Sequence, residues 1–133
     1  MARGLLAAGL GVVAAAAIVG VTLNQLDARA RLEGRAHALT GGNPYAGRAA
    51  IERRPCGGCH EIPGVPGAAG KVGPSLKGFS GRIYIGGRRQ NTPANLVAWI
   101  ENPRAIDPQN VMPPMGIGER EARDIAAYLY TLQ

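Results

Sequence analysis

The sequence predicts an all-α chain, in which one long apolar helix precedes a small domain of short helices joined by loops. The run Gly4–Leu26 contains no charged residue. Asn43-Pro44 and Thr92-Pro93 each combine a helix N-cap with a proline at the first helical position. No alternating strand pattern of any length occurs, and Ile83-Tyr84-Ile85 is too short to require a sheet. We therefore expect an anchor, a connector and a domain, at residues 1–26, 27–42 and 43–133.

The apolar run at the N-terminus has the length of a transmembrane helix. Its 23 residues suffice to cross a hydrocarbon core of about 30 Å. A cleaved signal peptide is the alternative, and Ala28-Arg29-Ala30 resembles its cleavage site. A signal peptide has an apolar core of only about 7–15 residues, and Asp27 lies between this run and the site. The sequence therefore favours an uncleaved anchor, followed by a connector that continues as helix to about Leu39.

Three further helices are expected after the connector. The first runs from Pro44 to about Arg54, where a proline follows. The second starts after Thr92 and ends at Asn102-Pro103. The last starts near Glu119 and has apolar residues at i, i+3, i+4 and i+7. Between the first two, residues 62–80 are rich in glycine and proline, which is typical of loops.

The two cysteines of the chain belong to the run Cys56-Gly57-Gly58-Cys59-His60. Two thiols at this spacing, followed at once by histidine, are the attachment signature of c-type haem. Each thiol adds to one vinyl group, and the histidine becomes an axial iron ligand. A zinc site would need four ligands, and a thioredoxin-like pair would need a βαβ context. The run therefore predicts one covalently bound haem c on Cys56 and Cys59, with His60 on the iron.

The second iron ligand has three candidates, namely Met112, Met115 and His37. The stretch from Asn102 to Pro114 is expected to be extended, and its prolines restrict the backbone around Met112. A thioether suits haem iron and raises its reduction potential. Met115 fits a space-filling role in the core better, and His37 fits a solvated linker.

Residues 43–133 resemble the class I c-type cytochromes. The resemblance is carried by the attachment signature and by Gly73-Pro74-x-Leu76, Asn102-Pro103, Met112-Pro113 and Ala127-Tyr128-Leu129. It implies the small class I cytochrome c fold, with short helices and loops around covalent haem.

The same resemblance assigns roles to single residues. Met112 follows Pro103 by nine residues, as in the family, which implies that Met112 is the second iron ligand. The carbonyl of Pro74 is expected to accept a hydrogen bond from the ligating histidine and so orient its ring. Trp99 is expected to pack beside haem and methionine, and Arg82 to contact a haem propionate or to be solvated.

A narrower resemblance covers residues 56–132. Its motifs are similar to the cytochrome c domain fused to subunit II of some haem–copper oxidases, and they comprise Gly64-x-x-Gly67-Ala68, Gly73-Pro74-x-Leu76, Asn91-Thr92-Pro93-x-Asn95-Leu96 and Trp99-Ile100. In this chain only the apolar anchor precedes the haem domain. The resemblance then implies a free-standing, membrane-tethered electron donor or an accessory oxidase subunit.

The charge of the chain bears on its partners. Residues 27–133 carry 14 basic and nine acidic side chains, a net charge of +5. Many of the basic residues are expected around the haem edge, where they could steer the domain toward an acidic redox partner or anionic lipid. A nucleic acid partner is disfavoured because an exported haem protein would not meet one.

The expected function is electron transport and not catalysis. We expect a mono-haem carrier that takes single electrons from another redox protein to a membrane complex, preferably a terminal haem–copper oxidase. The alternatives are the haem subunit of a membrane dehydrogenase, or a haem sensor or peroxidase whose methionine leaves the iron.

The expected location is the bacterial inner (cytoplasmic) membrane, crossed once, with the haem domain on the periplasmic side. Arg29, Arg31 and Arg35 oppose this orientation by the positive-inside rule. Attachment of haem outside the cytoplasm, which the family resemblance implies, favours it.

Overall fold

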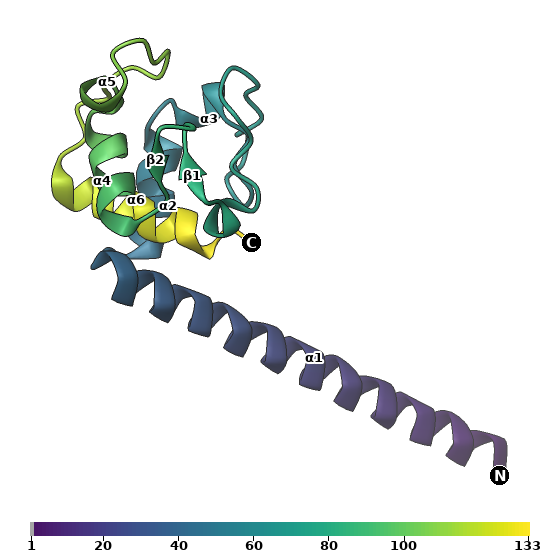
Figure 1. Ribbon diagram of the computed structural model, residues 1–133. Helices are drawn as coiled ribbons and strands as arrows, with labels where there is room; N and C mark the ends of the chain where they lie inside the picture. The colour runs from purple at the N-terminus through teal and green to yellow at the C-terminus, as the bar shows by residue number, and fades with distance from the viewer. Residues whose placement is uncertain (1) are drawn as a thin grey trace. The chain divides into compact units, whose positions relative to one another are not determined.

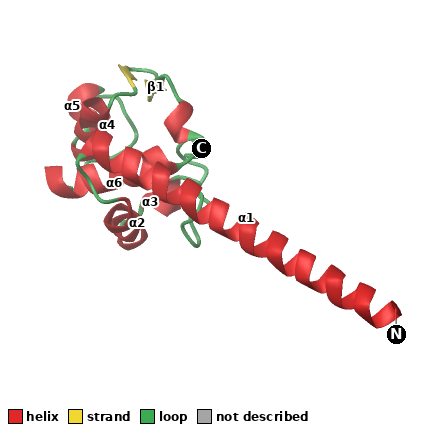
Figure 2. Ribbon diagram, turned by 90° about the horizontal axis from the view of Figure 1, so that it is seen from below, coloured by secondary structure: helices red, strands yellow, loops and turns green. Residues whose placement is uncertain are grey.

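The computed structural model describes the backbone of residues 2–133 and the side chains of residues 10–133. The chain is mostly helical, which confirms that part of the prediction (Figures 1 and 2). It divides into two compact units, Met1–Arg31 and Leu32–Gln133. The class I cytochrome c fold itself stays a prediction.

Helix α1 (Ala2–Thr40) covers residues 2–26 of the predicted anchor and continues into the predicted connector to Thr40, close to the expected helix end at about Leu39. Its segment Leu10–Thr40 is long and apolar enough to cross a membrane. The large apolar side chains between residues 10 and 26 are all exposed, as expected of a surface that lipid would solvate. The side chains of residues 4–9 lie outside the described part.

The last turns of α1 belong to the second unit and are packed there. Ala36 and Thr40 are 1% and 2% exposed. The Thr40 hydroxyl donates to the Ala36 carbonyl at 2.8 Å and accepts from the Gly42 amide at 3.1 Å. Arg123 donates through Nη1 to the Thr40 carbonyl at 3.1 Å. The connector therefore ends as a fixed part of the domain and not as a free linker.

Three helices form the core of the second unit, namely α2 (Pro44–Arg53), α4 (Pro93–Glu101) and α6 (Glu119–Thr131). They cluster together in Figure 1, with α6 between the other two. Helices α2 and α6 approach so closely that a Cβ on Gly47 would overlap the Asp124 backbone. Leu96, Ala122 and Ala126 are among the most buried residues of this core.

The predicted helix starts are confirmed. The Asn43 side chain accepts hydrogen bonds from the amides of Tyr45 and Ala46 at 2.9 and 3.2 Å. The Thr92 hydroxyl accepts one from the Asn95 amide at 3.3 Å. Each cap supplies an acceptor for amides that lack a partner inside the helix.

The expectation that no sheet forms is wrong, because residues 84–90 form a small hairpin (yellow in Figure 2). Strand β1 (Tyr84–Ile85) pairs antiparallel with β2 (Arg89–Gln90). Gly86 and Gly87 both have positive φ, of 54° and 68°, which is the requirement of a type I′ hairpin turn. Two glycines at the turn thus stabilise strands that are too short to show a pattern.

Three short helical segments complete the domain. They are α3 (Cys56–Cys59), η1 (Phe79–Gly81) and α5 (Pro103–Ile106). The prediction that the chain after Asn102 is extended is therefore wrong for its first four residues. The Asn102 side chain accepts from the Ala105 amide at 3.2 Å, so it caps α5 while also ending α4.

Candidate functional site

The predicted attachment cysteines lie at the two ends of helix α3. Cys56 is half-buried and packs against the core, whereas Cys59 is exposed. Both are free thiols. Cys56 and Cys59 are thus the first and last residues of a single helical turn, one facing the core and one facing solvent. Burial raises the pKa of the Cys56 thiol above its ordinary value.

The following loop fixes the backbone of α3. The amide of Gly70 donates to the Gly57 carbonyl at 3.0 Å, and the amide of Gly73 donates to the Cys59 carbonyl at 2.8 Å. A Cβ on Gly57 would lie only 2.8 Å from the Ala68 Cβ. This approach explains why the signature has glycine directly after its first cysteine.

The ring of His60 is oriented from two sides. Its Nδ1 lies 2.8 Å from the Pro74 carbonyl oxygen. A carbonyl can only accept, so Nδ1 carries the proton and Nε2 keeps the lone pair that a metal requires. A Cβ on Gly73 would overlap the imidazole, with Nδ1 at 2.7 Å and Nε2 at 2.8 Å. The contact expected at Pro74 is thus present, and the role of His60 toward iron stays a prediction.

The two candidate methionines are both half-buried against the core. The Met112 amide donates to the Asn110 side chain at 2.8 Å, so a turn precedes this residue. The Met115 carbonyl accepts from Nη1 of Arg54 at 2.9 Å. Burial does not separate the two candidates, and the assignment of Met112 rests on sequence spacing.

Arg54 is a structural residue of the site that the sequence analysis missed. Besides Met115 it binds Glu121 of α6, with Nη2 to Oε2 at 2.6 Å and Nε to Oε1 at 3.3 Å. This side-by-side pairing of guanidinium and carboxylate is the strong geometry for an ion pair. Arg54 therefore links the end of α2, two residues before Cys56, to the methionine loop and to α6.

Arg82 is held by backbone carbonyls in this structure. Its Nη2 donates to the carbonyls of Ser75 and Lys77, and its guanidinium lies 5.4 Å from the centre of the Phe79 ring. It is therefore half-buried and ordered by the protein, and not freely solvated. The propionate contact stays a prediction.

Trp99 is buried in α4, with 7% of its surface exposed. A Cβ on Gly86 would lie 2.5 Å from its ring. The tryptophan therefore supports the turn of the hairpin. Its predicted packing beside haem and methionine is not tested by this contact.

Large apolar side chains are exposed next to the predicted site residues. Val72 and Val111 are 73% and 78% exposed, and they directly precede Gly73 and Met112. Ile83 follows Arg82 and is 72% exposed. Isolated exposed apolar residues are common, but these three adjoin the residues expected around the porphyrin.

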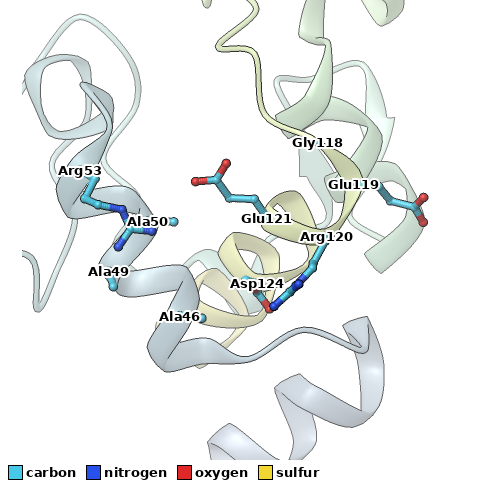
Figure 3. Close-up of a pocket in the computed structure, with 9 residues that line it drawn as sticks. All are labelled: Ala46, Ala49, Ala50, Arg53, Gly118, Glu119, Arg120, Glu121 and Asp124. Atoms are coloured by element: carbon cyan, nitrogen blue, oxygen red, sulfur yellow. The ribbon is translucent and has the colours of Figure 1, made fainter.

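Two hollows on the surface of the described residues lie away from the predicted haem residues. Figure 3 shows one between α2 and α6, bordered by Arg53, Glu121 and Asp124. A second lies between the end of α1, α4 and α6. Neither includes a predicted haem residue. Among the described residues, no three His, Cys, Asp or Glu side chains gather into a metal cluster; the predicted iron ligands are instead one histidine and one methionine.

The chain is similar to cytochrome c oxidase subunit 2 of Alkalihalophilus pseudofirmus. The two are 36% identical over 88 residues, which are 65% of this chain and 25% of that relative. The chain thus spans about a quarter of the length of the curated relative that it matches. No protein family model matches the sequence, and no solved structure matches it. The expected likeness to an oxidase subunit is therefore found, and membership of the class I cytochromes stays a prediction.

Proposed function

We propose that this protein is a membrane-anchored, mono-haem c-type cytochrome that carries single electrons in a respiratory chain. The observation that carries the proposal is the Cys56-x-x-Cys59-His60 signature, which begins on a one-turn helix. In it, Nδ1 of His60 is hydrogen-bonded to the Pro74 carbonyl. That arrangement leaves Nε2 of His60 available as a ligand. The donor set, two free thiols and an oriented imidazole, fits covalent haem c.

The residues present would hold the haem as follows. Cys56 and Cys59 would form the two thioether links, and His60 and Met112 would be the iron ligands. Exposed Val72, Ile83 and Val111 supply apolar surface that a porphyrin would cover. When bound, the haem supplies the one-electron redox chemistry, while the protein sets position, burial and ligand field. Two protein ligands on the iron would favour an electron carrier over a catalyst, and Met112 as one of them would raise the reduction potential.

The proposed electron acceptor is a terminal haem–copper oxidase, and the donor is another redox protein. The similarity to an oxidase subunit supports a place beside such a complex. The apolar part of α1 would hold the domain at the membrane, which raises its effective concentration at a membrane partner. The net positive charge of residues 27–133 favours an acidic docking face. We place the haem domain on the periplasmic side.

The deciding experiment compares oxygen consumption by membranes with and without this chain. We expect deletion to lower oxidase-dependent respiration, and the purified holoprotein to restore it in a manner that weakens with salt, because exposed charges are screened within about 8 Å at physiological ionic strength. Unchanged respiration together with loss of one dehydrogenase activity would assign the chain to a dehydrogenase complex instead.

A further inference from the structure

The carboxylate of Asp107 is the most enclosed acidic group in the four ion pairs of the described chain. Its side chain is 16% exposed, and Oδ2 accepts a hydrogen bond from Nε of Arg88 at 3.1 Å. Oδ1 accepts from the Gln109 amide at 3.3 Å. Both carboxylate oxygens thus have a partner within the protein. Asp107 is therefore a fixed point at the start of the methionine loop.

Hydrogen bonds continue from Asp107 to Met112. The Asp107 carbonyl accepts from the Asn110 amide at 2.9 Å. The Asn110 side chain in turn accepts from the Met112 amide at 2.8 Å. These local turns place Met112 relative to Asp107, so a displacement of Asp107 is passed along the loop to the methionine.

Arg88 is itself fixed, although 59% of its side chain is exposed. Its amide donates to the Ile85 carbonyl at 3.0 Å, which closes the hairpin turn. The turn lies against Trp99, because Gly86 leaves no room for even a Cβ there. The hairpin thus packs against α4, and its Arg88 binds Asp107 at the start of the methionine loop.

We propose that Arg88 and Asp107 are positioning residues that hold the Met112 loop closed over the haem iron. The inference rests on the proposed function, since it presumes haem ligation by Met112. Loops open locally with a free energy set by the contacts that hold them. Removal of the ion pair therefore raises the fraction of molecules in which Met112 has left the iron and an external ligand can bind.

The test uses the full-length holoprotein in detergent and the variants Arg88→Gln and Asp107→Asn. We expect both to bind carbon monoxide to ferrous iron about two- to fivefold faster than the parent protein, the factor for loss of one largely exposed ion pair. The near-infrared Met–Fe(III) band should weaken, and hydrogen exchange of the Met112 amide should quicken. Arg89→Gln is the matched control, because this neighbouring arginine takes part in none of the ion pairs of the described residues. Arg89→Gln should change neither the carbon monoxide binding rate, nor the near-infrared band, nor hydrogen exchange of the Met112 amide.

A double variant separates positioning from a general loss of charge. If Arg88 acts through Asp107, the double variant should bind carbon monoxide at about the same rate as either single variant, because the effects of coupled residues are not additive. Arg88→Lys should recover part of the band, since the charge remains. Equal carbon monoxide binding rates in the parent and all variants would overturn the positioning role of Arg88 and Asp107, and so would an equal effect of Arg89→Gln. The proposed function would still be upheld in that case if the parent protein shows the near-infrared Met–Fe(III) band. A parent protein without covalent haem or without that band overturns both.

Discussion

Gly73→Ala is the most direct perturbation of the proposed ligand His60. The backbone of Gly73 is not left-handed, so alanine meets no conformational strain there. Its methyl group, however, would occupy the space of the imidazole ring. The ring cannot simply move aside, because Nδ1 is bound to the Pro74 carbonyl at 2.8 Å. The loop cannot retreat either, because the Gly73 amide is bound to the Cys59 carbonyl.

The magnitude of this effect follows from two contributions. Insertion of a methyl group into tightly packed surroundings costs about 1–3 kcal/mol. Loss of the His60–Pro74 hydrogen bond adds about 1 kcal/mol. We expect Gly73→Ala to lower the free energy of unfolding by about 2–4 kcal/mol and to weaken the low-spin haem spectrum, because the ring would leave its axial position.

The measurement is urea unfolding of the holoprotein, followed by absorbance of the haem. Gly58→Ala is the control, since a Cβ at Gly58 meets nothing within 4 Å and the residue lies in the same signature. This control should change stability by less than about 1 kcal/mol, in the stabilising direction expected for glycine to alanine in a helix. Equal stability of Gly73→Ala and Gly58→Ala would refute the reasoning about the ring.

Three other predictions concern the second ligand, the core and the anchor. Met112→Ala should abolish the near-infrared Met–Fe(III) band and admit carbon monoxide, whereas Met115→Leu should do neither; the reverse pattern would move the ligand to Met115. Arg54→Gln should lower the free energy of unfolding in urea by about 2–3 kcal/mol, because it breaks a half-buried, hydrogen-bonded ion pair. The exposed pair of Arg48 is the control, and Arg48→Gln should cost less than about 1 kcal/mol. Mass spectrometry of the mature protein should find residues 4–26 retained; a mature N-terminus at Arg31 would show a cleaved signal peptide.

The features that the sequence predicted best are those that depend on residues close together in the chain, such as helix caps and helix starts. Asn43 and Thr92 cap helices because their short polar side chains reach amides two or three residues ahead. The start of α6 at Glu119 follows from apolar periodicity together with acidic residues near the helix N-terminus. The attachment signature is equally local, since both thiols and His60 lie within five residues, and the haem attachment that it predicts stays a prediction.

What the sequence did not predict depends on partners far along the chain or on very short elements. Arg54 meets Glu121 and Met115 from more than 60 residues away, and its type alone does not distinguish it from Arg53. The hairpin has strands of two residues, below the length at which alternation is visible; Gly86-Gly87 was the signal that would have indicated its turn.

The two proposed iron ligands are positioned by separate sets of contacts. His60 is oriented by Pro74 and by the space that Gly73 leaves, within one glycine-rich loop. Met112 is placed by turns that start at Asp107 and by Arg88 on the hairpin. A porphyrin held by Cys56 and Cys59 would join these sets, since its iron would bind a residue from each. The outer contact of the methionine loop is made by one largely exposed arginine, so we infer that loss of ligation would begin at this loop.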